Sequence, residues 1–211
     1  MNTIKEIQNL QPDKIFGDDY EGVLTLPSWT GFQSRQGCYA SKDKLGESDG
    51  AIKIRIIDGV KTTTTQQVNA IKFLIDNSDK IRNSILDTFI KELPNLREIY
   101  EDLIPKIEHV EDLKNVIGLS LLHIMPSDKD DYAYIGFEFG CNWDEEHGVG
   151  VMTHKDRVIA FGGADTSFDS WVTYEDNGTK EIEKRKYMEF HVQLQEEQKK
   201  IKPWWKFWSK I

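Results

Sequence analysis

The sequence has few cysteines and no long apolar run. Its only two cysteines, Cys38 and Cys141, lie far apart and show neither a CxxC motif nor zinc-type spacing. We therefore expect no disulfide framework and no structural zinc site. No apolar segment is long enough to span a bilayer, and the N-terminal segment MNTIKEIQNLQPDK lacks the apolar core of a signal peptide. These absences predict an intracellular, cytoplasmic protein.

Nucleotide-binding glycine motifs are also missing. Residues 161–168, FGGADTSF, bring two glycines together, but neither GxGxxG nor GxxxxGK[ST] occurs in the chain. The pattern therefore favours a tight turn, with Asp165 hydrogen-bonded to the loop, over a phosphate site. No internal repeat or low-complexity segment is visible.

The charge balance is acidic. The 211 residues contain 36 Asp and Glu against 27 Lys and Arg, a formal net charge of -9. Charged residues make up 30% and apolar residues 38%, which is typical of a folded protein and not of a disordered acidic chain. The general field repels polyanions, so nucleic-acid binding is not expected.

The first third of the chain predicts strands. Residues 22–27 alternate over a short segment, and residues 51–57 place Ile52, Ile54 and Ile56 on one face with Lys53 and Arg55 opposite. Residues 41–50 carry charges and glycines without a period, which indicates a polar hairpin connection or loop.

The middle of the chain predicts three or four helices. Apolar residues recur at helical spacing from residue 65, and again from residue 81 to 90. Pro94 predicts the end of the second helix, and a third then runs from Leu96 to the residue before Pro105. A short fourth helix over 110–117 is predicted to stop at Gly118, in the left-handed position that follows many helices.

A period of two then returns over 119–125, 132–139, 148–154 and 157–161, and the short connections predict an antiparallel meander. Residues 179–201 predict a surface helix. The predicted fold class is therefore α+β, with N-terminal strands, central helices, an antiparallel β-meander and a C-terminal helix. We expect one domain over 1–198, followed by a basic aromatic tail over 199–211.

The densest polar segment is GCNWDEEHG at residues 140–148, between two predicted strands. With one aspartate further along the chain, it supplies the candidate site residues Cys141, Trp143, Asp144, Glu145, Glu146, His147 and Asp165. The simplest interpretation is a solvated turn whose side chains cap backbone groups and fix the hairpin register.

Two chemical hypotheses stand beside the turn. Its carboxylates and imidazole could bind a divalent metal ion as a cofactor. Neighbouring side chains in a strand point to opposite faces, however, so consecutive residues rarely converge on one ion. A metal site therefore needs a further ligand such as His154 or Asp165. Alternatively, Cys141 activated by His147 and oriented by Asp165 has the residues of a thiol hydrolase. Adjacent Glu145 and Glu146 are a poor acid–base pair for the same geometric reason.

The tail KKIKPWWKFWSKI interleaves lysines with aromatic rings. Its predicted contact residues are Trp204, Trp205 and Trp208. Such a segment suits a bilayer interface or a phosphate face, although Pro203 interrupts any helix. The alternatives are that the tryptophans fold back over an apolar patch or dock on a partner protein.

Residues 134–152, YIGFEFGCNWDEEHGVGVM, continue through HKDRV at 154–158 to GGADTSF at 162–168. Over about 52–168 the chain resembles a family of uncharacterised bacterial domains of unknown function that carries this motif, GFEFGCxWDEEHGxGV…GGADTSF. The resemblance implies no catalytic residues, because none is assigned in the family.

Small acidic bacterial domains of this kind resemble immunity proteins, which neutralise a toxin domain by binding it. The resemblance implies a protein partner, and an acidic surface suits a basic toxin through charge complementarity. We therefore expect a non-enzymatic binding protein. The alternative is a metal-dependent or thiol hydrolase centred on residues 141–154.

Overall fold

The computed structural model describes residues 5–35, 44–59, 63–144 and 146–200. Its contacts divide the chain into two compact units, Met1–Thr173 and Tyr174–Ile211. The predicted boundary between a single domain and the tail at residue 198 stays a prediction. Cys38, Glu145 and the tail tryptophans Trp204, Trp205 and Trp208 lie outside the described residues.

The first unit contains a seven-stranded sheet in the order β1-β2-β5-β6-β7-β8-β9, and β3 pairs with β4 in a second, two-stranded sheet. The strands are β1 (Ile7–Pro12), β2 (Tyr20–Thr25), β3 (Gln33–Arg35), β4 (Lys44–Glu47), β5 (Ala51–Ile56), β6 (Ile117–Lys129), β7 (Tyr132–Cys141), β8 (Val149–His154) and β9 (Arg157–Gly163). The helices are α1 (Thr65–Asp76), α2 (Ser78–Tyr100), α3 (Ser170–Asp176) and α4 (Lys180–Lys200). Short 3₁₀ helices are η1 (Pro27–Trp29), η2 (Glu101–Leu103), η3 (Val110–Asn115) and η4 (Ala164–Phe168).

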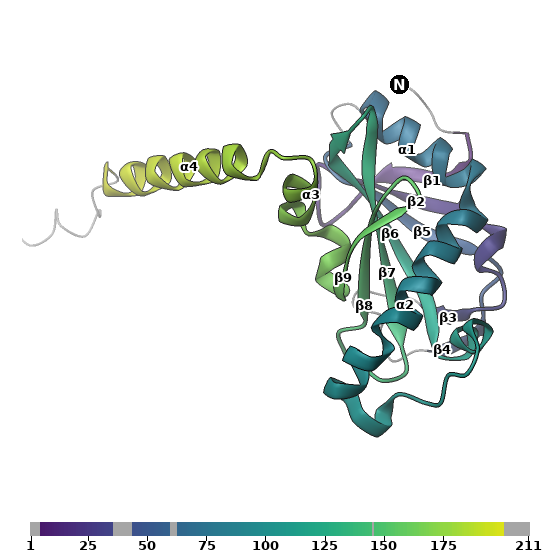
Figure 1. Cartoon of the computed structure of the whole chain (residues 1–211). Helices are drawn as coiled ribbons and strands as arrows, with labels where there is room; N and C mark the ends of the chain where they lie inside the picture. Colours follow the sequence, from purple (N-terminus) through teal and green to yellow (C-terminus); the bar gives the residue numbers. More distant parts are fainter. Residues whose placement is uncertain (1–4, 36–43, 60–62, 145, 201–211) are drawn as a thin grey trace, which may run out of the picture. The chain divides into compact units, whose positions relative to one another are not determined.

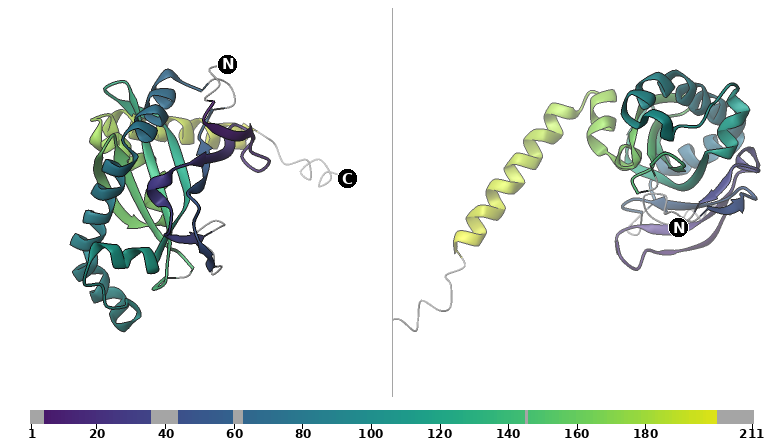
Figure 2. Two further views of the ribbon diagram at one scale, coloured as in Figure 1. Left: turned by 90° about the vertical axis from the view of Figure 1, so that its right-hand side faces the viewer. Right: turned by 90° about the horizontal axis from the view of Figure 1, so that it is seen from below.

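The large sheet is antiparallel except at its centre. Strands β6 to β9 form the predicted antiparallel meander, and β1, β2 and β5 pair in the same way. Strands β5 and β6 are parallel, because α1 and α2 carry the chain back across the sheet between them. The fold class is α+β, as the sequence predicts. Figure 2 shows the purple N-terminal strands at one edge of this sheet.

One face of the sheet packs against α1 and α2 (Figure 1). The predicted alternation in β5 holds, since Ile52, Ile54 and Ile56 are all at most 2% exposed. Ile54 and Ile56 lie in register with Leu122 and Ile124 of β6. The helices supply the other half of this core, and their buried residues include Val68, Ile71, Leu74, Ile81, Ile85, Phe89 and Leu93. Burial of these stripes stabilises both layers together.

The prediction that α2 ends at Pro94 is wrong. The helix continues to Tyr100 with Pro94 inside it, and the predicted third helix is the last part of α2. A proline inside a helix removes one backbone hydrogen bond. The apolar stripe continues past it, because Leu93 is buried and Leu96 and Tyr100 pack against the core. Tertiary packing therefore outweighs the local cost of the proline.

The predicted helix over 110–117 is also different in detail. It is the 3₁₀ helix η3, and Gly118 lies inside β6 instead of following a helix. A Cβ atom at Gly118 would lie 2.1 Å from the carbonyl oxygen of Gln33. This glycine therefore allows strand β3 to approach β6 closely.

Glycines also decide how the other face of the sheet is covered. A Cβ atom at Gly136 would lie 1.5 Å from the carbonyl oxygen of Ser167, and one at Gly150 would lie 2.7 Å from the Ser167 nitrogen. The η4 segment therefore rests directly on the backbone of β7 and β8. Beside it, Met125, Tyr134 and Met152 form a second, smaller apolar cluster.

Beneath η4 lies a buried polar pair. The His123 Nε2 atom lies 3.0 Å from Glu138 Oε2, and both side chains are at most 3% exposed. The ring of Phe168 lies 5.2 Å from the His123 ring. The GGADTSF segment is therefore a cover for this half of the sheet, which differs from the tight turn with a bonded Asp165 that the sequence suggests.

The second unit contains α4, the predicted C-terminal helix. Its larger apolar side chains are exposed, among them Ile182, Tyr187, Met188, Phe190, Val192 and Leu194. Within the residues that the structure describes, no helix combines the length and apolar character needed to cross a membrane.

Candidate functional site

Asp144 organises the turn between β7 and β8. Its Oδ1 atom accepts hydrogen bonds from the backbone nitrogens of His147 at 2.9 Å and Glu146 at 3.3 Å. The His147 ring contacts the same oxygen through Nδ1 at 3.2 Å. The second carboxylate oxygen accepts a hydrogen bond of 2.7 Å from the Tyr100 hydroxyl, at the end of α2. The carboxylate thus caps the turn and joins it to a helix distant in sequence.

These contacts shift the pKa values of Asp144 and Tyr100. Burial by itself would raise the pKa of Asp144, but the His147 backbone, the Tyr100 hydroxyl and the His147 ring outweigh it and lower that pKa. Burial and the hydrogen bond to Asp144 raise the pKa of Tyr100 to about 12. Asp144 is therefore a carboxylate at neutral pH, and Tyr100 is a neutral donor.

Cys141 does not have the environment of a nucleophile. Its side chain is fully buried, and its thiol contacts the backbone oxygen of Asp144 at 3.5 Å. Burial raises the pKa of this thiol to about 12, so almost none of it is thiolate at neutral pH. His147, which the thiol-hydrolase hypothesis requires as a base, directs its ring to Asp144. The arrangement favours a small buried side chain over an active thiol.

The remaining predicted site residues do not all lie at one place in the structure. Trp143 is 3% exposed, and its indole nitrogen has no hydrogen-bond partner among the described residues. Asp165 is exposed at the start of η4. His154 is buried in β8, where its Nε2 atom lies 2.8 Å from the Lys129 carbonyl oxygen and its ring packs against Tyr134. The structure therefore brings Asp144, His147 and Asp165 to one surface and places Trp143 and His154 in the interior.

The metal hypothesis needs several ligands at one point. Among the described residues, no group of three or more His, Cys, Asp or Glu side chains is placed to hold a metal ion. Carboxylate Oδ1 of Asp144 already accepts three contacts inside the turn. The residues that the structure describes do not form the set of ligands a metal would require.

A surface groove runs from the turn along α2 and β9. One hollow of about 480 Å³ is lined by Tyr100, Asp144, His147, Gly163, Ala164 and Asp165. A neighbouring hollow of about 220 Å³ shares Tyr100 and Gly163 with it. The walls of the second hollow are Glu92, Asn95, Leu96, Ile99, Gly148, Val149, Phe161 and Gly162. Because β9 is the last strand of the sheet, one of its edges pairs with no other described strand.

The groove carries negative charge beside apolar surface. Glu92, Asp144 and Asp165 line it, and none of the three pairs with a lysine or arginine in the described part of the chain. Leu96, Ile99 and Phe161 supply the apolar walls, and Ile99 is 71% exposed. We call this surface, with its carboxylates and apolar walls, the α2–β9 groove.

Sequence reasoning missed the contribution of α2. Tyr100 and Glu92 were not candidates, because Pro94 predicted a break in the helix between them. The signal that would have found Tyr100 is its place on the apolar stripe of Phe89, Leu93 and Leu96, which continues past the proline.

A comparison with protein-family models supports the resemblance to domains of unknown function that the sequence indicates. The family model described as a domain of unknown function (DUF6985) matches residues 26–168, which is more than half of the chain. This match includes the turn, the cover segment η4 and all of the α2–β9 groove residues. No curated protein and no solved structure matches the chain. The chain belongs to the DUF6985 family of domains of unknown function.

Proposed function

We propose that the chain is a non-enzymatic binding protein whose α2–β9 groove receives a basic segment of a partner protein. The observation that carries the proposal is the pair of groove carboxylates Glu92 and Asp165, which have no lysine or arginine partner among the described residues. Asp144 adds negative charge beside them, but its oxygens are already bonded to Tyr100 and His147. A lysine or arginine of the partner would supply the missing opposite charge.

The groove also offers two other kinds of contact. Leu96, Ile99 and Phe161 provide an apolar wall for an anchor residue, the type of contact that dominates binding energy at protein interfaces. The outer edge of β9 provides backbone groups to which an extended segment can add as a strand. A basic, extended segment with one apolar anchor fits all three features.

The partner proposed is a toxin domain, and the chain is its immunity protein in a bacterial cell. A net charge of -9 favours fast association with a basic toxin by electrostatic steering. The hydrolase alternative lacks such support, because Cys141 is buried with a raised pKa and the polar side chains of the turn are occupied with one another.

Co-expression with the product of the adjacent gene tests the proposal. We expect protection of the host cell and a stable complex in size-exclusion chromatography. The double variant Glu92→Lys/Asp165→Lys should weaken the complex at least about tenfold, since each reversed charge meets a like charge on the partner.

Asp87→Lys is the matched control, because Asp87 is exposed on α2 outside the groove. It makes a charge change of the same kind and should leave the complex intact. Neither protection nor a complex would contradict the immunity role. A complex that resists the double variant would contradict the groove as its binding surface.

A further inference from the structure

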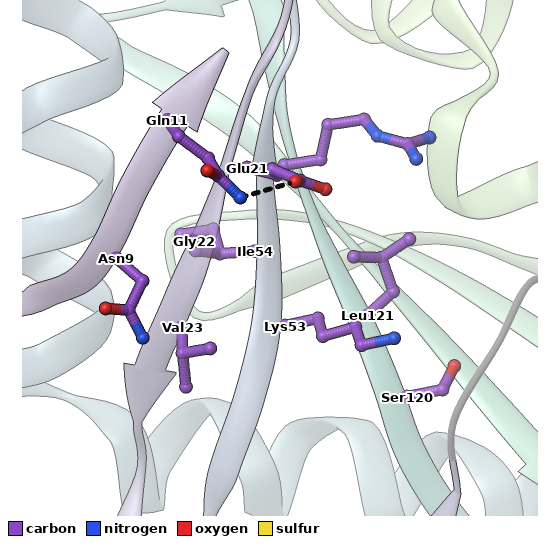
Figure 3. Close-up of a pocket in the computed structure, with 10 residues that line it drawn as sticks. Asn9, Gln11, Glu21, Gly22, Val23, Lys53, Ile54, Ser120 and Leu121 are labelled. Atoms are coloured by element: carbon purple, nitrogen blue, oxygen red, sulfur yellow. Dashed lines mark hydrogen bonds between the residues drawn. The ribbon is translucent and has the colours of Figure 1, made fainter. Parts of the chain in front are cut away.

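The second face of the sheet, opposite α1 and α2, has a cavity in its N-terminal half. The cavity has a volume of about 290 Å³. It is lined by Asn9, Gln11, Glu21, Gly22, Val23, Lys53, Ile54, Arg55, Ser120 and Leu121 (Figure 3). These residues belong to β1, β2, β5 and β6, and the η4 segment packs on β7 and β8 instead.

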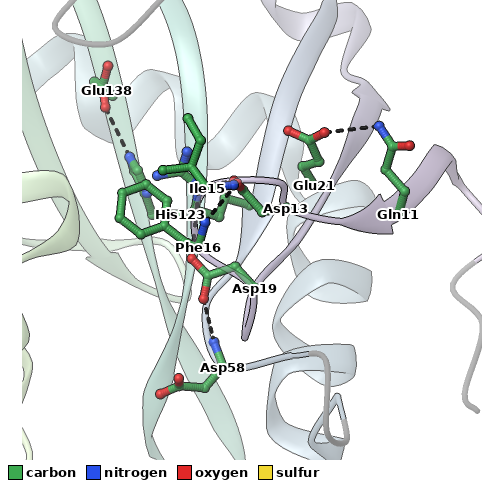
Figure 4. A network of polar contacts seen from close by, with 10 residues as sticks. Gln11, Asp13, Ile15, Phe16, Asp19, Glu21, Asp58, His123 and Glu138 are labelled. Carbon is green, nitrogen blue, oxygen red and sulfur yellow. Dashed lines mark hydrogen bonds and ion pairs between the residues drawn. The ribbon is translucent and has the colours of Figure 1, made fainter.

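One of the three charged residues on the cavity wall, Arg55, is already paired. The Arg55 Nε atom lies 3.3 Å from Asp13 and 4.0 Å from Asp19, and the centre of the Phe16 ring lies 4.9 Å from its guanidinium carbon. Asp19 also accepts a hydrogen bond of 2.9 Å from the Asp58 nitrogen (Figure 4). Arg55 is therefore held by the loop between β1 and β2 and has a structural role.

Two charges on the cavity wall are not used in this way. In the described part of the chain, the Lys53 ammonium pairs with no carboxylate, and Glu21 pairs with no cation. Glu21 accepts a single hydrogen bond of 2.9 Å, from the Gln11 amide. In Figure 3 the Lys53 side chain extends toward Leu121 and Ser120, away from the Glu21 carboxylate.

The strand register explains why these charges lie on either side of a small space. Val23, Lys53 and Leu121 are direct neighbours across β2, β5 and β6, and Glu21 is two residues from Val23 on the same face. Diagonal neighbours of this kind have Cα atoms about 7–8 Å apart, within reach of two long side chains. Val23 and Leu121 add apolar surface to the same cavity on either side of Lys53.

We propose that this cavity binds a small zwitterion, an α-amino acid with an apolar side chain. Lys53 receives the carboxylate of the ligand. Glu21 and the Gln11 amide oxygen receive its ammonium group, while Val23 and Leu121 contact its side chain. The volume is at the lower limit of the range of about 300–1,000 Å³ for small-molecule sites, so it suits a ligand of amino-acid size.

Isothermal titration calorimetry and thermal denaturation with L-leucine, L-isoleucine, L-valine, L-methionine and L-phenylalanine test this site. We expect at least one of them to bind and to raise the melting temperature. If L-leucine binds, 4-methylpentanoate and isoamylamine, which are leucine without its ammonium group and without its carboxylate, should each bind at least about tenfold more weakly, because one ionic contact is lost.

Lys53→Met and Glu21→Gln should each weaken binding about tenfold without unfolding the protein. Lys72→Met is the matched control, since Lys72 is exposed on α1, and it should bind like the wild type. Glu92→Lys/Asp165→Lys should also bind normally, which separates this site from the α2–β9 groove. Absence of binding by all five amino acids, or unchanged binding by Lys53→Met, would overturn the proposal.

Discussion

The two halves of the second sheet face differ in how their polar groups are used. In the half formed by β7 and β8, η4 lies directly on Gly136 and Gly150 and encloses the His123–Glu138 pair. In the half formed by β1, β2 and β5, a cavity remains, with Glu21 and Lys53 on its wall. The first half buries its polar groups as a pair, and the second leaves Glu21 and Lys53 without an ionic partner among the described residues.

The difference follows from side-chain size along the strands. A glycine lets another backbone approach the sheet, whereas the side chains of Val23, Lys53 and Leu121, which are neighbours across three strands, keep it away. Substitutions in the covered half should therefore cost stability, and substitutions in the open half should cost binding instead.

Gly136→Ala should have the largest effect on stability. The added methyl group would lie 1.5 Å from the Ser167 carbonyl oxygen, so η4 must move, at a cost of about 3 kcal/mol. Urea denaturation measures this loss. Gly17→Ala is the control, because a Cβ atom there meets nothing within 4 Å, and it should change stability by less than about 0.5 kcal/mol. Equal effects of the two variants would contradict the close approach of η4.

Glu138→Leu should cost about 2 kcal/mol, since it leaves the buried His123 ring without its carboxylate partner. The double variant His123→Leu/Glu138→Leu should recover part of this loss, because the buried imidazole is then removed together with its carboxylate partner. Chemical denaturation of both proteins makes the comparison. A double variant less stable than the single one would show that the pair does not act as a unit.

Asp144→Asn should cost about 1 kcal/mol at neutral pH, because hydrogen bonds to a charged acceptor are stronger than those to a neutral one. The fold lowers the pKa of Asp144 below its ordinary value of 3.8, so the carboxylate stabilises the folded state above that pH. This contribution is lost as the pH falls through the lower pKa of the folded protein.

The stability difference between wild type and Asp144→Asn should therefore shrink on acidification, in denaturation experiments from neutral pH to about pH 2. A difference that stays constant over this range would show that the cost arises from packing and not from the carboxylate charge.

Glu21→Gln and Lys53→Met should have the smallest effect on stability, less than about 0.5 kcal/mol each. Neither side chain has an ionic partner among the described residues, so its removal leaves no buried group unpaired. The same denaturation measurement applies. A loss above about 2 kcal/mol for either variant would place it with the structural pairs of the covered half.

Local periodicity was sufficient to predict most elements of the fold. Strands β5 to β9 and helix α1 lie where alternating or helical spacing indicates them. It was insufficient at Pro94 and Gly118, where local propensity and tertiary contacts disagree. Leu96 packs against the core, and Gln33 approaches Gly118 closely. Both contacts join residues far apart in sequence, which local periodicity cannot predict.

The contacts of the candidate site within one turn could be predicted from the sequence, but those between distant segments could not. Asp144 and His147 meet within the turn, because three residues separate them and a short polar loop brings them together. Tyr100 reaches Asp144 from α2, and Glu21 on β2 lines the same cavity as Lys53 on β5, although these strands are far apart in sequence. Such pairs depend on sheet order and helix length.

The sequence by itself determined the α+β class, the antiparallel meander, the turn at Asp144 and the family to which residues 26–168 belong. Each of these depends on residues close in sequence or on a continuous motif. The tertiary structure decided that Cys141 is buried, that η4 covers only half of a sheet face, and that carboxylates gather beside α2. The physical reason is that burial and charge proximity arise only when distant segments pack together.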